Sequence, residues 1–277
     1  GKSTTTALIG HVLAAAGRAV EIGGNLGTPA LTLAPLSEGG IYALEMSSYQ
    51  LEITPSLAFA VAVLINISAD HLERHGGMDG YVAAKRLIFR KAGTAVIGID
   101  DSYCRRMRDD LAAAGGIRIV TISGTNAEAD VYVAGRRLID RMGGAPVAVA
   151  DLSRAAALPG AHNGQNAAAA YAAVRALGIA AETAARGLLT FPGLAHRQEH
   201  IATIGGVRYI NDSKATNAEA AGHALDSYET IYWIAGGVPK AGGIATLAPL
   251  FPRVAHAFLI GEAAEDFAHT LEGRVAY

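Results

Sequence analysis

Short apolar runs alternate with longer Ala- and Leu-rich stretches along most of the chain. The apolar runs predict buried strands and occupy residues 41–45, 59–67, 94–99 and 117–122. The Ala- and Leu-rich stretches predict helices that each end at a glycine, over residues 4–17, 78–93 and 102–115. Strands that alternate with helices are typical of parallel sheets joined by crossover helices. We therefore expect an α/β fold with a mostly parallel sheet.

The pattern changes in the middle of the chain. Residues 129–150 carry short apolar segments around Gly-rich turns, which favours a small antiparallel patch. Residues 163–178 are rich in alanine and predict one long helix.

Pro192 and Gly193 then interrupt the helical pattern and mark the predicted domain boundary. A second series of strands follows at residues 207–213, 231–237, 256–261 and 273–277. We expect a central domain at residues 1–192 and a smaller Rossmann-like α/β domain at residues 193–277.

Composition narrows the class of protein. The 277 residues are 51% hydrophobic and 17% charged, with a formal net charge of −2. This near-neutral balance argues against a nucleic acid or a membrane surface as the main partner, because both favour clustered Lys and Arg. No apolar run approaches the ~20 residues of a membrane span. Cys104 is the only cysteine, so an internal disulfide is excluded and a reducing compartment is the simple interpretation.

The first four residues, Gly1, Lys2, Ser3 and Thr4, have the order that ends a phosphate-binding loop. Glycine lets backbone N–H groups approach phosphate, lysine bridges the β- and γ-phosphates, and the following hydroxyl holds Mg²⁺. A helix after the loop would add its positive N-terminal dipole. Four residues are a weak signal, and Ser or Thr capping of an amphipathic helix is the alternative.

Two predicted strands are followed closely by residues of types that can bind metal ions. Glu45 ends the first strand, and Asp70-His71 follows the second. Ligands of open α/β sheets lie beyond the carboxyl ends of strands, so Glu45 is a candidate Mg²⁺ ligand, with a solvated loop residue as the alternative. His71 and His75 are four residues apart, which invites a zinc interpretation. Leu72 stands where helical zinc proteases carry glutamate, so the zinc motif is incomplete.

Four polar residues remain open to two interpretations each. Lys85 lies on a predicted helix among apolar neighbours, which suggests partial burial rather than the solvated position usual for lysine. Asn25 belongs to a Gly-rich stretch that allows a tight backbone near a ligand but also fits a plain turn. Asn163 and Asn166 share one helix face and could present amides to a nucleotide or cap the helix.

The densest cluster of polar residues is "YINDSKATNAEA" in the second domain. A strand ends there near Asp212, Lys214 follows, and Thr216 with Glu219 fits a capping box for the next helix. The capping box does not account for Asp212 and Lys214, so we expect these two residues to belong to a functional site. Further cationic side chains in this domain are His196, Arg197 and Lys240.

In this order, the motifs resemble those of the Mur ligases, the ATP-dependent amide-forming enzymes of peptidoglycan synthesis. The segments that carry this resemblance are "GKST", "GGNLGTP", "EMSSYQLE", "NISADHLERHGGMDGYVAAKRLIF", "GAHNGQNAAAA", "LAHRQE" and "NDSKATN". They cover nearly the whole chain in the family's order. "SSYQLE" and "NDSKATN" resemble most the member that adds D-glutamate. The family's fold implies a P-loop-type ATP-binding domain followed by the smaller Rossmann-like domain.

The resemblance implies a role for each candidate. Gly1, Lys2, Ser3 and Thr4 would bind ATP, as would Asn25, Asn163, Asn166, Arg197 and Asp212, or orient groups that do. Two Mg²⁺ ions are implied, one held by Thr4 and Glu45 and the other by His71 and Lys85. Lys85 would be carbamylated, since an ammonium cannot ligate Mg²⁺ but a carbamate can. The residues facing the reacting groups would be Ser47, Lys214, Thr216 and Lys240. Val238 and Pro239 depart from the family pattern just before Lys240.

The implied reaction is formation of an amide bond through an acyl phosphate. The carboxylate of UDP-N-acetylmuramoyl-L-alanine attacks the γ-phosphate of ATP, and the amine of D-glutamate then displaces phosphate. The resemblance also implies a cytoplasmic, monomeric enzyme whose partners are these small molecules.

Two alternatives follow from the same residues. The first is another Mur-type or folylpolyglutamate-type ligase, and the second is a nucleotide-binding module without catalysis. Because the phosphate loop lacks its first half and the pattern stops after residues 273–277, we expect a chain that is truncated at both ends and inactive by itself.

Overall fold

The chain divides into two compact units, and each is described by itself. The computed structural model of the protein describes residues 1–240 and 242–277. The first unit comprises Gly1–Pro192 and the second Gly193–Tyr277. Within the described part of the chain, no helix is both long and apolar enough to cross a bilayer.

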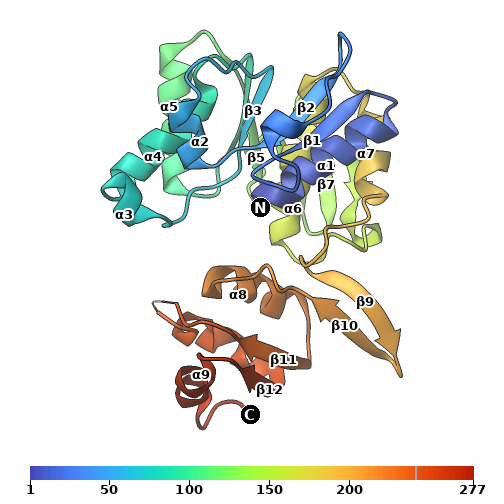
Figure 1. Ribbon diagram of the computed structural model, residues 1–277. Coiled ribbons are helices and arrows are strands. Elements are labelled where there is room, and N and C mark those ends of the chain that lie inside the picture. Colours follow the sequence, from blue (N-terminus) through green and yellow to red (C-terminus); the bar gives the residue numbers. More distant parts are fainter. Residues whose placement is uncertain (241) are drawn as a thin grey trace. The chain divides into compact units, whose positions relative to one another are not determined.

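Six strands among the described residues form the main sheet of the first unit (Figure 1). In spatial order they are β3 (Val61–Leu64), β4 (Thr94–Gly98), β5 (Arg118–Ser123), β6 (Val131–Ala134), β7 (Arg137–Asp140) and β8 (Val147–Asp151). Neighbours from β3 to β6 run parallel, whereas β7 and β8 are antiparallel additions at one edge. β1 (Val20–Gly24) and β2 (Ile41–Glu45) form a separate parallel pair. The predicted α/β class with a mostly parallel sheet is confirmed, and the expected antiparallel patch continues that sheet.

Helices connect these strands. They are α1 (Lys2–Ala15), α2 (Ser48–Ile53), α3 (Leu72–His75), α4 (Met78–Arg86), α5 (Ser102–Ala114), α6 (His162–Ala176) and α7 (Ala181–Leu189), with short 3₁₀ turns η1 (Ala30–Thr32), η2 (Leu87–Phe89) and η3 (Leu152–Arg154). The helix predicted over residues 78–93 is therefore shorter, because η2 replaces its last part. β4 is buried at all five residues, as expected of a central parallel strand with helices on both faces.

The core of the first unit has two parts. α6 packs on β3 to β7 and also on α1 and α7, and Tyr171 at its middle is fully buried. Alanines at residues 167–170 keep the helix narrow enough for these close approaches. On the other part, α4 and α5 cover β3 and β4 through a cluster that includes Tyr81 and Met107.

The second unit contains two small sheets. β9 (Glu199–Ile204) and β10 (Val207–Asn211) form an antiparallel hairpin, and β11 (Ile231–Gly236) pairs in parallel with β12 (Val254–Ile260). Its helices are α8 (Ala218–Ser227) and α9 (Ala264–Leu271), with the 3₁₀ segment η4 (Ala245–Arg253). Leu225, Phe251 and Leu271 lie in its apolar core.

Two local predictions for this unit are wrong. The first is the capping box, because the N-cap of α8 is Asn217, whose side-chain oxygen accepts a hydrogen bond from Ala220 N at 2.8 Å. Asparagine is the stronger N-cap residue, so it displaces Thr216 from that position. The second is the strand at residues 273–277. Gly273 adopts a left-handed φ of 69°, and residues 273–277 form no strand, although Ala276 O accepts a hydrogen bond from Ala257 N at 2.8 Å.

Candidate active site

The predicted phosphate loop residues form the N-terminal end of α1. The helix starts at Lys2, and its N-cap is Gly1, which has no side-chain cap. Ser3 and Thr4 therefore lie inside the first turn, and the alternative that they cap the helix is wrong. The first turn of an α-helix presents backbone N–H groups and a positive dipole end, which suit an anion. Lys2 is exposed at this end, where it can reach a phosphate.

Glu45 is the last residue of β2 and is buried, at 4% exposure. Its Oε1 accepts a hydrogen bond from Asn25 Nδ2 at 3.1 Å. Its Oε2 is buried and has no hydrogen-bond partner among the residues that the structure describes. An unpartnered carboxylate oxygen in a buried position is costly unless a cation satisfies it. The site therefore fits a hard divalent cation such as Mg²⁺.

The backbone around Glu45 is tightly built. Asn25 N donates to Glu45 O at 2.8 Å, so the ends of β1 and β2 are joined. Gly24 has φ 96°, and a Cβ at this position would lie 2.4 Å from Glu45 O. Glycine is required there because any side chain would push these two strand ends apart.

Asn163 and Asn166 lie at the start of α6 and connect it to α1. Asn166 Nδ2 donates to Asn163 Oδ1 at 3.0 Å, and Asn163 Nδ2 donates to Pro159 O at 2.7 Å. Thr5 Oγ1 donates to Asn166 Oδ1 at 3.3 Å. The helix has no side-chain cap, so neither asparagine serves the capping role considered from the sequence. Both amides are buried, and they fix the phosphate-loop end of α1 against α6.

His71 follows β3 in a left-handed backbone conformation, with φ 51° and ψ 29°. Its side chain is half exposed, and its Nε2 lies 3.4 Å from Asp70 Oδ2. The ring also contacts Tyr49, with centroids 5.3 Å apart. A non-glycine residue with positive φ is uncommon and points to a constrained position.

Lys85 on α4 is partly buried, with Nζ 4.7 Å from the centroid of the Tyr81 ring. Burial and, to a smaller extent, the positive charge of Lys2 together lower the pKa of Lys85 to about 8, against the opposing effects of Cys104 and Asp70. The start of α1, where Lys2 lies, is thus close enough to Lys85 for its charge to affect the pKa of Lys85. A neutral amine is therefore accessible near physiological pH.

Most candidates of the second unit lie on two adjacent loops. Asp212 Oδ1 accepts from Gln198 N at 2.9 Å, and Lys214 N donates to His196 O at 3.1 Å. Burial raises the pKa of Asp212, and Arg197 opposes that shift, so Arg197 and Asp212 are neighbours. Lys214 and Thr216 are exposed. Lys240 is exposed in the loop after β11, and no contact of its side chain with this cluster is found among the described residues.

Ser47 has a structural role that the sequence analysis missed. It is the N-cap of α2, where its Oγ accepts from Gln50 N at 3.2 Å and its N–H donates to Gln50 Oε1 at 2.8 Å. This reciprocal pair is a capping box. Its signal was present in the sequence as Ser followed three residues later by Gln.

Gln165 is a second residue that the sequence analysis missed. Its Nε2 donates to Asp100 Oδ2 at 2.7 Å, and its Oε1 accepts from Asn66 Nδ2 at 3.1 Å. It thus ties the ends of β3 and β4 to α6, next to the two asparagines. No local pattern signals it, because its partners lie 65 and 99 residues away.

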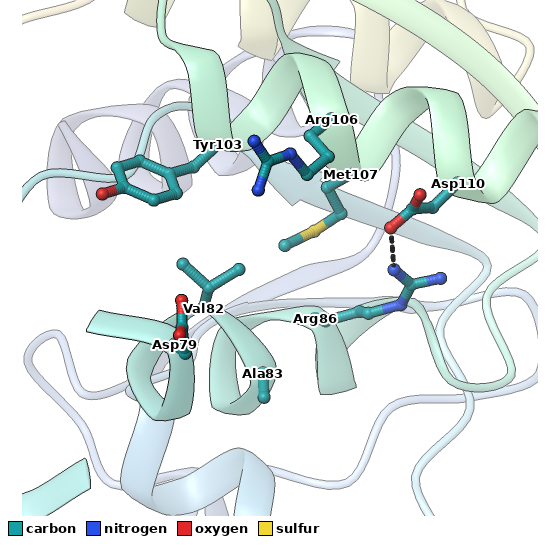
Figure 2. A pocket seen from close by; sticks show the side chains of 8 residues that line it. All are labelled: Asp79, Val82, Ala83, Arg86, Tyr103, Arg106, Met107 and Asp110. Atoms are coloured by element: carbon teal, nitrogen blue, oxygen red, sulfur yellow. Dashed lines mark hydrogen bonds and ion pairs between the residues drawn. The ribbon is translucent and has the colours of Figure 1, made fainter. Parts of the chain in front are cut away.

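A hollow of about 210 Å³ lies between α4 and α5. Figure 2 shows Tyr103 and Arg106 extending from α5 on one side, with Asp79 and Val82 of α4 on the other. Arg86 Nη1 and Asp110 Oδ2 form an ion pair of 2.7 Å at its edge. None of the predicted site residues lines this hollow. In the described part of the chain, no three His, Cys, Asp or Glu side chains gather as a metal site, so a cation at Glu45 needs other ligands as well.

The chain matches a family model described as the Mur ligase middle domain over residues 1–174. It is 56% identical to a UDP-N-acetylmuramoylalanine–D-glutamate ligase of Caulobacter vibrioides, over 99% of this chain and 59% of that protein. It is 57% identical to the ligase of the same name from Rhodospirillum rubrum, over 99% of this chain and 58% of that protein. The chain thus spans less than two thirds of the length of these relatives.

Solved structures of low sequence identity share the fold. MurF from Acinetobacter baumannii superposes with a TM-score of 0.73 at 23% identity, covering 99% of this chain and 65% of that one. MurC from Thermotoga maritima gives a TM-score of 0.73 at 19% identity, covering 100% of this chain and 64% of that one.

Proposed function

The chain belongs to the Mur ligase family, and from this membership we propose that it carries the ATP-binding and catalytic residues of a D-glutamate-adding ligase. The reaction joins D-glutamate to UDP-N-acetylmuramoyl-L-alanine with conversion of ATP to ADP and phosphate. The names of the relatives that are 56% and 57% identical support this substrate choice. The cytoplasm, where the nucleotide-linked precursor is soluble, is the proposed location, and a monomer is the proposed state.

The observation that carries the proposal is the buried Oε2 of Glu45 at the carboxyl end of β2, which has no hydrogen-bond partner among the residues described by the structure. This oxygen supports a Mg²⁺ site shared with Thr4. When bound, Mg²⁺ supplies positive charge that offsets the repulsion between the attacking carboxylate and the γ-phosphate. Lys2 and the N–H groups of the first turn of α1 would bind and orient the phosphates. Asn163 and Asn166 would hold this turn in place through Thr5.

A second Mg²⁺ site is proposed at His71 and a carbamylated Lys85. With its pKa lowered to about 8, roughly a quarter of Lys85 is neutral near pH 7.5, against about 0.1% at the ordinary lysine value. The neutral amine attacks CO₂, a C–N bond forms, and one proton leaves to solvent. The product is a carbamate, which offers the oxygen ligands that Mg²⁺ prefers.

The second unit supplies the remaining proposed roles. Arg197 and Asp212 would contact ATP, and Lys214, Thr216 and Lys240 would contact the reacting carboxylate, the phosphate or D-glutamate. The hydrogen bonds of His196, Gln198 and Asp212 support the proposed roles of Arg197 and Asp212, because these bonds fix the two loops relative to each other. Cationic side chains at such a site stabilise the charge that develops on the transferred phosphoryl group.

The test is phosphate release from ATP by the protein that carries this chain, with UDP-N-acetylmuramoyl-L-alanine and one amino acid at a time. We expect release with D-glutamate and little with L-glutamate, L-lysine or meso-diaminopimelate. Lys2→Ala should abolish the release, whereas Lys91→Ala, at an exposed position of the same unit, should leave it unchanged. An equal rate with another amino acid would contradict the proposed substrate.

A further inference from the structure

His75 is a buried histidine that the proposed reaction does not use. Its side chain is 1% exposed, although it lies at the end of α3, a helix of only four residues. Left-handed residues flank this helix, with His71 at φ 51° and Gly76 at φ 68°. So short a helix cannot hold its own conformation, and packing against other elements must fix it.

Both ring nitrogens of His75 face polar atoms of α2. Nε2 lies 3.0 Å from Ser48 Oγ, and Nδ1 lies 3.6 Å from Glu52 Oε1. Arg74, the preceding residue, also contacts Glu52, with Nη2 3.5 Å from Oε2. α3 is thus joined to α2 by polar contacts on two side chains. The polar side chains of α2 thus bind α3, a role that the sequence pattern does not indicate.

The ring of His75 contacts two tyrosines. The Tyr49 ring centroid lies 5.4 Å away and the Tyr81 centroid 5.5 Å away. Tyr49 contacts the ring of His71 as well, at 5.3 Å. Tyr81, which is 4% exposed, lies under Lys85 Nζ at 4.7 Å. An unbroken row of side chains therefore runs from His71 through Tyr49, His75 and Tyr81 to Lys85.

We propose that His75 is a positioning residue that sets the separation and orientation of His71 and Lys85. Its ring packs against both tyrosines, and its hydrogen bond with Ser48 restrains rotation of the ring. Packed interiors resist changes of even one methylene group, so a smaller side chain at this position would let both tyrosines shift. The proposal rests on the proposed function only in that His71 and Lys85 act in the reaction; the positioning itself does not depend on it.

The first readout is the NMR signal of the Lys85 ε-methylene group, which the aromatic ring of Tyr81 shifts. The chain has only five lysines, so ¹³C-lysine labelling gives five such signals, and Lys85→Met assigns the one of interest. We expect His75→Ala to move the Lys85 signal toward the range of exposed lysines. His75→Phe keeps an aromatic ring against both tyrosines and should retain most of the shift.

The matched control is His11, which has similar contacts far along the sequence in the same unit. Its Nε2 lies 3.0 Å from Thr190 Oγ1, and its ring lies 5.7 Å from that of Phe191. His11→Ala should leave the Lys85 signal in place. An unchanged Lys85 signal in folded His75→Ala, or an equal change in His11→Ala, overturns the proposal.

The second readout is steady-state kinetics of the protein that carries the chain. His75→Ala should lower kcat at least about tenfold and change the KM for ATP by less than about threefold. The KM should change little because the residues of α1 that are proposed to bind the triphosphate are unaltered. His75→Phe should fall between this variant and the wild type. A rise in KM alone counts against the proposal. If the wild type shows no ligase activity, the proposed function fails, while the NMR readout still decides the positioning role.

Discussion

We expect the charged Lys85 side chain to lower the free energy of unfolding at neutral pH. Its replacement by methionine should remove this loss. The pKa of Lys85 is lowered from 10.5 to about 8, mainly by burial. A folded-state pKa below the unfolded value means that the unfolded chain binds more protons, so stability rises with pH between about 8 and 10.5. Below that window the full penalty applies. At about 1.4 kcal/mol for each pKa unit, the penalty is about 3 kcal/mol.

Methionine keeps the apolar stem without the charge. Loss of the cation–π contact with Tyr81 would offset about 0.5–1 kcal/mol of the gain. We therefore expect Lys85→Met to raise the free energy of unfolding of the first unit by about 2 kcal/mol near pH 6.5. The difference between variant and wild type should shrink by about 2 kcal/mol between about pH 6.5 and 9.5, as the wild-type amine loses its proton.

The assay must separate the two units. Trp233 is the only tryptophan and lies in the second unit, so its fluorescence during urea unfolding serves as an internal control that should not change. Amide hydrogen exchange of β4 and α4 reports on the first unit. Buffers free of CO₂ and Mg²⁺ keep Lys85 unmodified. Lys91→Met, at an exposed position, is the matched control and should change little.

The reasoning is refuted if Lys85→Met is less stable than the wild type near pH 6.5, or if the difference does not depend on pH. A stabilising variant without activity would instead show that the buried amine is kept for function at the expense of stability.

Three further predictions concern other parts of the first unit. Glu45→Gln keeps the contact with Asn25 but loses the charge, so Mg²⁺-dependent ATP binding in calorimetry should weaken at least about tenfold; unchanged affinity would remove Glu45 from the metal site. Gly98→Ala would bring a Cβ to 1.9 Å from Ile65 O, and we expect a loss of more than about 3 kcal/mol in thermal unfolding; a loss below about 1 kcal/mol would show that β3 and β4 can separate locally. Tyr171→Phe removes the 2.7 Å bond from the buried hydroxyl to Asp140 Oδ2 and should cost about 1–3 kcal/mol in urea unfolding. A neutral result would mean that Met142 N and Arg175 satisfy the carboxylate without the hydroxyl.

Sequence patterns predicted the buried strands of the first unit and their end residues well, because these depend on local features. An apolar run followed by a carboxylate is enough to place Glu45 at the end of β2. The same reasoning predicted β4, β5 and the long α6. These are buried parallel strands and an Ala-rich helix, whose composition reflects burial on more than one side.

Contacts between distant segments could not be predicted in this way. His75 was considered only as part of an incomplete zinc motif, because its main partner, Ser48, lies 27 residues away. The bond of Gln165 to Asp100 spans 65 residues. The capping box at Thr216 was wrong because two polar residues compete for one helix start, and the adjacent Asn217 is the better cap. Local propensity identifies such candidates but does not decide between them.

The bond between Thr5 and Asn166 has a consequence for how the protein is made. The two residues are 161 positions apart, so α1 leaves the ribosome long before α6 exists. At about 5–20 residues per second, synthesis of the intervening segment takes on the order of ten seconds or more. During that time the apolar side of α1, which α6 and α7 cover in the finished unit, lacks its native partners. Closing so long a loop is entropically unfavourable until α6 can pack. The start of α1, although synthesised well before α6, therefore gains its native contacts only after α6 has emerged, and the nascent chain should depend on chaperones until then.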